Sequence, residues 1–513
     1  MPEDHSPLAS LVRRGVLSGT LGLILTLLVS DVPPLHAAEP LRPVQTMMHA
    51  HTTWSTGDLS LDELVARARA IGVEAVFLTE NQLLRFEYGL PPLRHLLRYR
   101  VDYPSLLSRG PEAFLAAIKA VNARQQHVLL IPGAEVIPEY YWTGNLFAGT
   151  LTMHDAQKNI LVFGLYQPED YRELPAVGNL GAARWGATSV WLLSPALLGL
   201  PGIWLLRLRG RRSVQLQYFR VTEERRYTGY GILCLLLGVI LLANNFPFRI
   251  PPASPYDPAA GLRPHQAVID FVNSRGGLAV WSMPEARDHR VITVAGFQAT
   301  LQTNPYPHDL LRTDRFTGFG GVYEDTTHFT DPRGSWDQLL MAYVHGQRTA
   351  PAWAIGEAAF HREGEAGKRF GDVRTVLLAP RTDAPTLLQA MRAGRLYALQ
   401  RTPDVSLVLD QFQAVLPGRP PAESGSTLFL VIREQPEIQA AIRTSPERRM
   451  AVEARLIRSG VVVQSVRGET PIIIRWKDAP LSPNTRLYFR LEVHGPAGHQ
   501  ILSNPIFVQS ARG

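Results

Sequence analysis

Two long segments without a charged side chain set the strongest limit on how this chain can fold. Residues 185–206 and 227–248 are each 22 residues long and contain no Asp, Glu, Lys or Arg. A helix needs about 20 apolar residues to cross the hydrocarbon core of a bilayer. Pro195 and Pro201 weaken the first segment, because each proline removes a helix hydrogen bond. We predict a transmembrane helical hairpin over residues 185–248, with a buried core hairpin as the alternative.

The loop between these two segments is strongly basic. Residues 207–226 hold seven arginines and two glutamates, a net charge of +5 out of the formal +7 of the 513-residue chain. Basic loops stay on the cytoplasmic side of a membrane. We therefore expect this loop to be cytoplasmic and the flanking parts to be periplasmic or extracellular. Only +2 remains for the other residues, which excludes a broad basic surface and argues against a nucleic-acid partner.

The start of the chain agrees with export. Arg13 and Arg14 precede an uncharged run from Gly15 to Ser30, and small residues follow at Ala37 and Ala38. This order is typical of a secretory signal. We predict a signal peptide or an uncleaved N-terminal anchor over residues 1–38. The single cysteine lies in the second apolar segment, so the exported part is expected to have no disulfide.

Short apolar runs alternate with helical periodicity from residue 44 onward. Ser60 and Glu63 form a capping box before a helix that we predict over 61–71, and a buried strand follows at 75–78. The alternation repeats, with predicted helices at 111–125, 264–274, 335–346 and 384–393 and predicted strands at 127–131, 160–165, 278–281 and 352–355. Strands that alternate with helices predict parallel βαβ units, whose functional sites lie at the carboxyl ends of the strands.

The predicted architecture is therefore α/β: a barrel formed by residues 44–184 and 249–401 and interrupted by the hairpin. Such an insertion costs little if it starts and ends at nearby points. After residue 402 the apolar residues follow period two, with several short strands and no cluster of catalytic residue types. We predict a β-sandwich accessory domain over 402–513.

Two histidines close the first predicted strand. Side chains alternate along a strand, so His49 and His51 are expected to point the same way and could hold one metal ion. The alternative is a pair of histidines that hydrogen-bond to the backbone. Glu135 follows the strand that ends near Ile131, where it is either a third ligand or a solvated turn residue.

Taken in order, six motifs give this chain a resemblance to the PHP family of polymerase-associated and histidinol-phosphatase hydrolases. They are HAHTTWSTG (49–57), FLTEN (77–81), GAE (133–135), NILVFG (159–164), GGLAVWSMP (276–284) and GE (356–357). The resemblance covers about 44–400 apart from the hairpin. It implies a distorted seven-stranded barrel that holds two or three divalent ions, often zinc, manganese or iron, and hydrolyses phosphoesters.

The chain departs from the family pattern at several metal ligands. Asn81, Asn159 and Met283 stand where the pattern has histidine, and the closing Asp-x-His becomes Glu357-Ala358-Ala359. Neutral amides and thioethers are poor ligands for these cations. The resemblance implies that one metal site keeps its ligands, so we predict one metal rather than three on His49, His51, Glu135 and Glu357, with His361 near enough to replace the lost histidine.

Two acidic residues complete the predicted catalytic set. Glu80 stands where the family has an aspartate that orients a ligand, and an ordinary surface glutamate is the alternative. Asp58 lies close to a position that is acidic or histidine in the family. Arg287, His289 and Arg290 follow Met283 near the expected mouth of the site, where they either bind a substrate anion or are solvated.

Two functions follow from these predictions. The first is a membrane-anchored, extracytoplasmic metal-dependent hydrolase that acts on a small-molecule phosphoester. The second is a catalytically inactive relative that binds a ligand or takes part in envelope interactions. The lost histidines favour the second function, and the retained set of ligands for one metal favours the first.

Overall fold

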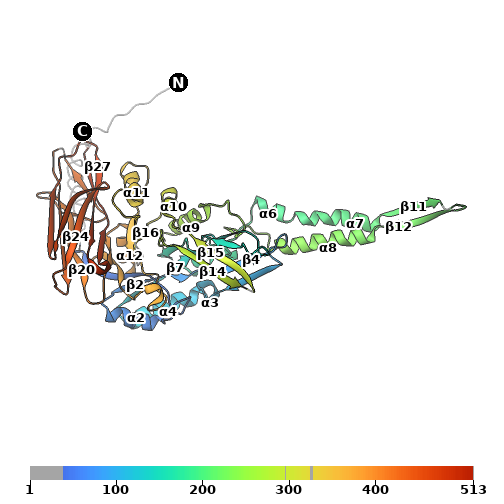
Figure 1. Ribbon diagram of the computed structural model, residues 1–513, viewed down its shortest axis with the longest axis horizontal. Helices are drawn as coiled ribbons and strands as arrows, with labels where there is room; N and C mark the ends of the chain where they lie inside the picture. The colour runs from blue at the N-terminus through green and yellow to red at the C-terminus, as the bar shows by residue number, and fades with distance from the viewer. Residues whose placement is uncertain (1–38, 216, 295, 324–326, 432, 512–513) are drawn as a thin grey trace, which may run out of the picture. The chain divides into compact units, whose positions relative to one another are not determined.

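The computed structural model describes residues 39–215, 217–294, 296–323, 327–431 and 433–511. The chain divides into the segment Met1–Leu41 and a compact unit, Arg42–Gly513, which contains all the helices and strands named here. The predicted signal or anchor over 1–38 lies outside the described residues. The unit is a mixed α/β structure, which confirms the predicted class (Figure 1).

One sheet is built around the first strand. Strand β1 (Arg42–Ala50) pairs in parallel with β2 (Ala75–Leu78), which pairs in parallel with β6 (Leu129–Ile131). On its other side β1 pairs antiparallel with β18 (Val373–Ala379), and β18 pairs with β19 (Leu396–Gln400). The side chains of β2 are fully buried, as their apolar run predicts.

A second sheet of six strands carries most of the predicted strand ends. Its order is β17 (Trp353–Gly356), β16 (Gly318–Val322), β13 (Leu278–Trp281), β10 (Ile160–Phe163), β7 (Gly133–Val136) and β3 (Glu80–Asn81). Strand β10 runs antiparallel to both neighbours, so the prediction of purely parallel units is wrong there. Between β7 and β10 the chain forms β8 and β9 and no crossover helix, and a parallel pair would need one.

The predicted helices are confirmed within about two residues at each end. The capping box of Ser60 and Glu63 is present at the start of the first helix. These helices are α2 (Leu61–Ala70), α4 (Pro111–Arg124), α9 (Arg263–Ser274), α11 (Ser335–Val344) and α12 (Ala384–Arg392), and the shorter ones are α3 (Leu106–Arg109), α5 (Pro168–Glu173) and α10 (Pro307–Arg312). Their apolar faces pack on the strands around Phe114, Trp281 and Trp336. Closure of the strands into one barrel stays a prediction.

The C-terminal strands continue the first sheet. Strand β28 (Gln500–Ser503) pairs with β19, and the sheet goes on through β27 (Arg486–His494), β29 (Ile506–Ser510), β22 (Thr427–Leu430), β24 (Ala451–Arg458) and β25 (Val461–Glu469). A separate sheet contains β20 (Ser406–Val415), β21 (Ala422–Glu423), β23 (Glu437–Ser445) and β26 (Ile472–Lys477). The fully buried Arg490 reaches from β27 to Asp337 of α11, with Nε to Oδ1 at 2.8 Å.

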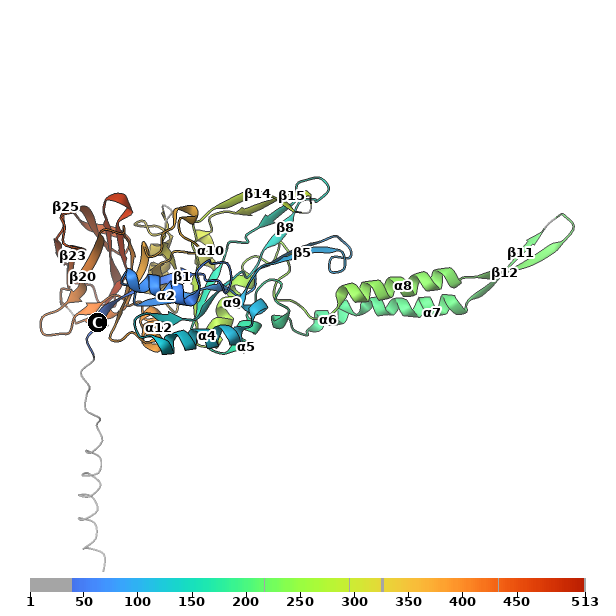
Figure 2. The ribbon, with the colours of Figure 1, turned by 90° about the horizontal axis from the view of Figure 1, so that it is seen from below.

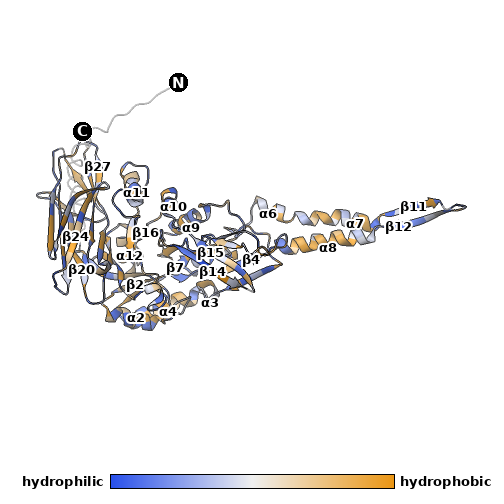
Figure 3. Cartoon of the chain, viewed as in Figure 1, coloured by the Kyte–Doolittle hydropathy of each residue, from blue (hydrophilic) through white to orange (hydrophobic). Residues whose placement is uncertain are grey.

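The segment over 185–248 forms a helical hairpin. Helices α6 (Ala187–Leu192) and α7 (Gly199–Arg207) lead into a ribbon of β11 (Arg209–Gln215) and β12 (Arg220–Arg226), and α8 (Thr228–Asn245) returns beside α7 (Figure 2). Figure 3 shows apolar residues along both α7 and α8. By length and composition Ala187–Arg207 and Thr228–Asn245 can each cross a membrane, with mean hydropathies of 1.6 and 1.7.

The two ends of the hairpin meet. Arg184 N donates to Ile250 O at 3.0 Å, and Ile250 N donates back to Arg184 O at 2.8 Å. The insertion therefore starts and ends at neighbouring points, as expected of a loop insertion that leaves the surrounding strands intact. That the hairpin crosses a membrane stays a prediction.

Two further groups of strands were not expected from the sequence. One is a ribbon of β4 (Arg85–Gly89) and β5 (Arg98–Asp102). The other is a four-stranded sheet in the order β14 (Asp288–Val294), β15 (Phe297–Thr303), β9 (Thr152–His154) and β8 (Tyr141–Thr143).

Candidate metal centre

The first histidine of the pair sits in a strand irregularity. The register of β1 against β2 shifts between Met48 and Ala50, and His49 has a φ of 66°. Neighbouring backbone hydrogen bonds hold this conformation, because Phe360 N donates to His49 O and His51 N donates to Phe360 O, both at 2.9 Å. The histidines therefore converge because of this bulge rather than because of the simple alternation that we expected from an unbroken strand.

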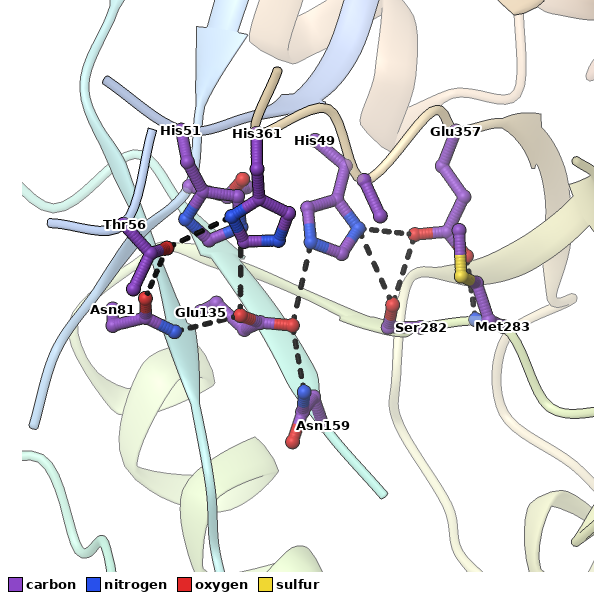
Figure 4. A network of polar contacts seen from close by, with 12 residues as sticks. His49, His51, Thr56, Asn81, Glu135, Asn159, Ser282, Met283, Glu357 and His361 are labelled. Atoms are coloured by element: carbon purple, nitrogen blue, oxygen red, sulfur yellow. Dashed lines mark hydrogen bonds and ion pairs between the residues drawn. The ribbon is translucent and has the colours of Figure 1, made fainter. Parts of the chain in front are cut away.

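The two imidazoles meet at one carboxylate. His49 Nε2 lies 3.3 Å from Glu135 Oε1, and His51 Nε2 lies 3.5 Å from Glu135 Oε2 (Figure 4). All three side chains are buried, and one ligand atom from each lies within 4.8 Å of the others. Both Nε2 atoms are buried, and the described residues offer them no hydrogen bond of good geometry. Buried nitrogens without such a bond are costly, so this group is suited to a metal ion.

The other ring nitrogen of each histidine, Nδ1, contacts a serine whose hydroxyl donates to a buried glutamate. His49 Nδ1 lies 2.8 Å from Glu357 Oε2 and 3.3 Å from Ser282 Oγ. His51 Nδ1 lies 3.3 Å from Ser55 Oγ, whose hydroxyl donates to Glu80. A carboxylate only accepts hydrogen bonds, and the Ser55 hydroxyl hydrogen is already donated to Glu80, so each ring, when it is neutral, carries its proton on Nδ1. Each Nε2 lone pair is then free to bind a cation.

Glu357 was predicted as a ligand, and the structure gives its carboxylate a different set of contacts. It accepts hydrogen bonds from His49 Nδ1, from Ser282 Oγ at 3.0 Å and from the backbone N of Met283 at 2.5 Å. Gly320 makes room for it, since a Cβ there would lie 1.7 Å from Glu357 Oε1. In this arrangement Glu357 contacts Nδ1 of His49, and Nε2 of the same ring faces Glu135.

Glu80 has the corresponding place beside His51. It is fully buried, so the alternative of an ordinary surface glutamate is wrong. Its Oε1 accepts from Thr52 N at 2.9 Å, and its Oε2 accepts from Ser55. Burial raises the pKa of Glu80 to about 7, although these hydrogen bonds act in the opposite direction. Glu80 holds the turn that follows His51.

Asparagines occupy two positions where the resemblance implies histidine. Asn81 Nδ2 donates to Glu135 Oε2 at 2.8 Å, and Asn159 Nδ2 donates to Glu135 Oε1 at 2.6 Å. Each oxygen of the carboxylate therefore has one amide donor and keeps lone pairs for a cation. At the third such position, Met283 contributes its backbone N to Glu357. These replacements hold the carboxylates in place.

The remaining predicted residues fall on either side of the site. The His361 ring stacks on the His51 ring, with centroids 4.1 Å apart, and its Nδ1 lies 2.9 Å from Thr56 Oγ1. The Asp58 side chain is exposed, and the backbone N of Asp58 donates to His361 O at 3.1 Å. The structure thus brings His361, but not the carboxylate of Asp58, to the centre.

The charges at the centre favour a cation. Burial acts to lower the pKa of His49, but Glu135 and Glu357 outweigh it and raise this pKa to about 9. Burial and the neighbouring His361 bring the pKa of His51 well below its usual value. Burial acts to raise the pKa of Glu135, but the positive His49 outweighs it and lowers this pKa below its usual range. The protonated ring of His49 therefore puts a positive charge beside the ionised carboxylate of Glu135, where a bound metal ion would also put one.

The centre opens into a cleft of about 410 Å³. Its lining includes His49, Glu135 and His361, together with three cationic side chains, Arg287, Arg290 and Lys368. Nε of Arg290 lies 2.8 Å from Oδ1 of Asp288.

Sequence reasoning missed Ser55, Ser282 and Lys368. The position of Ser282 directly after a strand was an available signal, whereas nothing in the pattern around Lys368 indicated its place.

Comparisons with known proteins give structural neighbours only. No family model matches the sequence, and no curated protein matches it. A two-domain protein from Bacteroides vulgatus ATCC 8482, described as containing a predicted PHP-like metal-dependent phosphoesterase, matches with a TM-score of 0.35 and 10% identity, over 91% of this chain and 95% of that one. A protein from Bifidobacterium adolescentis ATCC 15703, provisionally described as a metal-dependent phosphoesterase, matches with a TM-score of 0.27 and 14% identity, over 63% of this chain and 90% of that one.

Proposed function

We propose that this chain is a metal-dependent phosphoester hydrolase that holds one divalent cation on His49, His51 and Glu135. The observation that carries the proposal is the pair of buried Nε2 atoms, which lack a good hydrogen bond and meet at one ionised carboxylate. Two imidazoles and one carboxylate suit zinc, manganese or iron, and three protein ligands leave a coordination position for a reactant. We propose that the chain has the PHP-like barrel, because the six motifs place these residues at successive strand ends.

The residues around the three ligands fix their orientation. Glu357 with Ser282 holds Nδ1 of His49, and Glu80 with Ser55 holds Nδ1 of His51, so both rings present Nε2 to the centre. Such partners outside the ligand set typically change metal affinity by about 10- to 100-fold. A cation bound there would lower the pKa of a water molecule and polarise a phosphoryl oxygen.

His361 is placed to move a proton. Thr56 Oγ1 donates to Asn81 Oδ1 at 3.0 Å, so its oxygen accepts from His361 Nδ1 and leaves Nε2 as the basic atom. Burial lowers the pKa of His361, which keeps the ring neutral near pH 7 and able to take a proton. Arg287 and Lys368 in the same cleft supply positive charge for a phosphate group.

The proposal includes the predicted topology. Helices α7 and α8 anchor the unit in the membrane, the ribbon of β11 and β12 is cytoplasmic, and the metal centre is periplasmic or extracellular. The support is the apolar character of both spans and the arginines of the ribbon.

Metal analysis of the purified full chain tests the proposal. We expect about one equivalent of transition metal, lost in His51→Ala and kept in a control, His154→Ala, because His154 contacts Thr143 and Tyr141 instead of the centre. Metal-dependent phosphate release from a phosphoester should fall with the metal content. A preparation that never binds metal would exclude the hydrolase, and two or three equivalents would exclude a single-metal site. Bound metal without hydrolysis would favour the inactive ligand-binding alternative.

A further inference from the structure

A second, larger cleft opens beside the metal centre. It has a volume of about 1050 Å³ and lies between the β4–β5 ribbon and the sheet of β14, β15, β9 and β8. Its lining is mostly apolar and aromatic and includes Leu84, Phe86, Tyr88, Trp142, Phe297 and Leu301. Sites for small molecules usually span about 300–1,000 Å³, so this cleft alone can take a large apolar group.

The two clefts are continuous. Thr56, Arg290 and His361 line both of them, and His361 stacks on the ligand residue His51. A single elongated molecule can therefore place one end at the metal centre and the other in the apolar cleft. The end at the metal centre meets positive and metal-binding groups, and the other end meets hydrocarbon, so the molecule that fits is an amphiphile.

The far rim of the apolar cleft is attached to the helical hairpin. Leu96 and Leu97 line the cleft, and the backbone N atoms of His95 and Leu96 lie 3.0 and 3.4 Å from Oδ1 of Asn244 in the last turn of α8. Beside them, the guanidinium of Arg94 lies 4.1 Å from the ring centroid of Tyr256, just after the hairpin. The end of the second apolar helix and the mouth of the cleft are thus one connected structure.

The rim also exposes large apolar side chains. Leu97 is 53% exposed, Phe147 is 76% exposed and Phe297 is 41% exposed. Phe147 and Phe297 contact each other, with ring centroids 6.4 Å apart. Leu97 and Phe297 both line the cleft; exposed apolar side chains beside a cleft mark a site of contact, and aromatic residues are favoured at the membrane–water interface. A membrane entered by α8 would bring its surface to this rim.

We propose that the substrate is a membrane lipid with a phosphoester headgroup, whose hydrocarbon chain occupies the apolar cleft while its phosphate lies at the metal centre. This inference rests on the proposed function, because it places the headgroup at the hydrolytic site. The lipid enters from the bilayer across the rim of Leu97 and Phe297. A small water-soluble phosphoester would leave the apolar cleft without a partner.

Binding of alkyl phosphates tests the inference separately from catalysis. Methyl, butyl and octyl phosphate are titrated into the full chain held in an amphipathic polymer, by calorimetry and below their micelle concentrations. We expect affinity to rise with chain length, by up to about fourfold for each methylene buried. The variant Leu97→Asp with Phe297→Asp should remove most of this dependence. The control Ile473→Asp changes an apolar residue of β26 that is more exposed, at 67%, and should keep the dependence.

Equal affinity for all three phosphates, or unchanged chain-length dependence in the double variant, would overturn the inference. Phosphate release from the same compounds, with and without metal, then separates the two claims. Hydrolysis of methyl and octyl phosphate at equal kcat/KM would leave the proposed function standing and remove the lipid. Binding that depends on chain length without any metal-dependent hydrolysis would keep the lipid-binding cleft and remove the hydrolase.

Discussion

The orienting role assigned to Glu357 can be tested without changing any titratable residue. Gly320 of β16 faces the Glu357 carboxylate, and an added Cβ would lie 1.7 Å from Oε1 and 2.6 Å from Cδ. The φ of Gly320 lies outside the left-handed region, so alanine fits the backbone and the perturbation is steric. Gly320→Ala therefore moves one carboxylate and removes no charge.

The size of the effect follows from these distances. Real Cβ atoms essentially never approach closer than 3.0 Å, so Oε1 has to move by at least 1.3 Å from its 1.7 Å position. Glu357 accepts from Met283 N at 2.5 Å and from His49 Nδ1 at 2.8 Å, and a shift of that size breaks or lengthens these bonds. Loss of such a partner weakens metal binding by about 10- to 100-fold, which is about 1.4–2.8 kcal/mol.

The assay is a chelator-competition titration of zinc into the purified full chain, with thermal unfolding measured in parallel. Gly321→Ala is the matched control, because the three atoms nearest to its Cβ would belong to Ala354, at 2.8 Å, Leu502, at 3.3 Å, and Phe319, at 3.4 Å, and none to Glu357. Both variants are expected to lose stability, and only Gly320→Ala should lose metal affinity. Zinc affinity unchanged in Gly320→Ala, or reduced equally in Gly321→Ala, would refute the orienting role.

Other predictions follow from the same structure. A metal has to displace the proton of His49, whose pKa is about 9, so metal affinity should rise by about tenfold per pH unit up to pH 9; a flat profile contradicts this. Burial raises the pKa of Glu80 to about 7, so its protonated form is favoured in the fold, and the free energy of unfolding of the metal-free chain should fall as the pH rises from 4.5 to 7. Denaturant titrations of Glu80→Gln should not show that fall. Arg490→Met should destabilise the chain by about 3–5 kcal/mol in denaturant titrations, since it removes the ion-pair partner of the buried Asp337, which keeps hydrogen bonds from Tyr488 and from Arg333 N. An export-dependent reporter joined after Gln215 should be inactive, whereas activity there would reverse the proposed topology.

Regular elements could be predicted because their signals are local. The capping box at Ser60 and the buried strand over 278–281 are each specified by neighbouring residues. The orientation of β10 and the joining of β19 to β28 depend instead on partners far along the chain. Strand β14 also escaped prediction, because its sequence DHRVITV lacks a clear apolar alternation.

The candidate metal centre could be predicted only in part, for a similar reason. His49 and His51 lie at the end of β1 and Glu135 lies shortly after β6, and the ends of these two strands can be located from the sequence. The contacts of Glu357 depend on the backbone of Met283 and on the space at Gly320. Residue type alone cannot distinguish a carboxylate that binds a metal from one that accepts a hydrogen bond from a metal-binding histidine.

The backbone pair between Arg184 and Ile250 has an evolutionary consequence. Because the chain leaves and rejoins the unit at one point, a single in-frame insertion there adds the hairpin without moving any strand register. A single deletion removes it and needs only a short turn to rejoin the ends, and it also removes Asn244, which accepts from the backbone N atoms of His95 and Leu96. On the proposed topology, a shortened gene lacking residues 186–249 is a direct route to a detergent-free form for crystallisation.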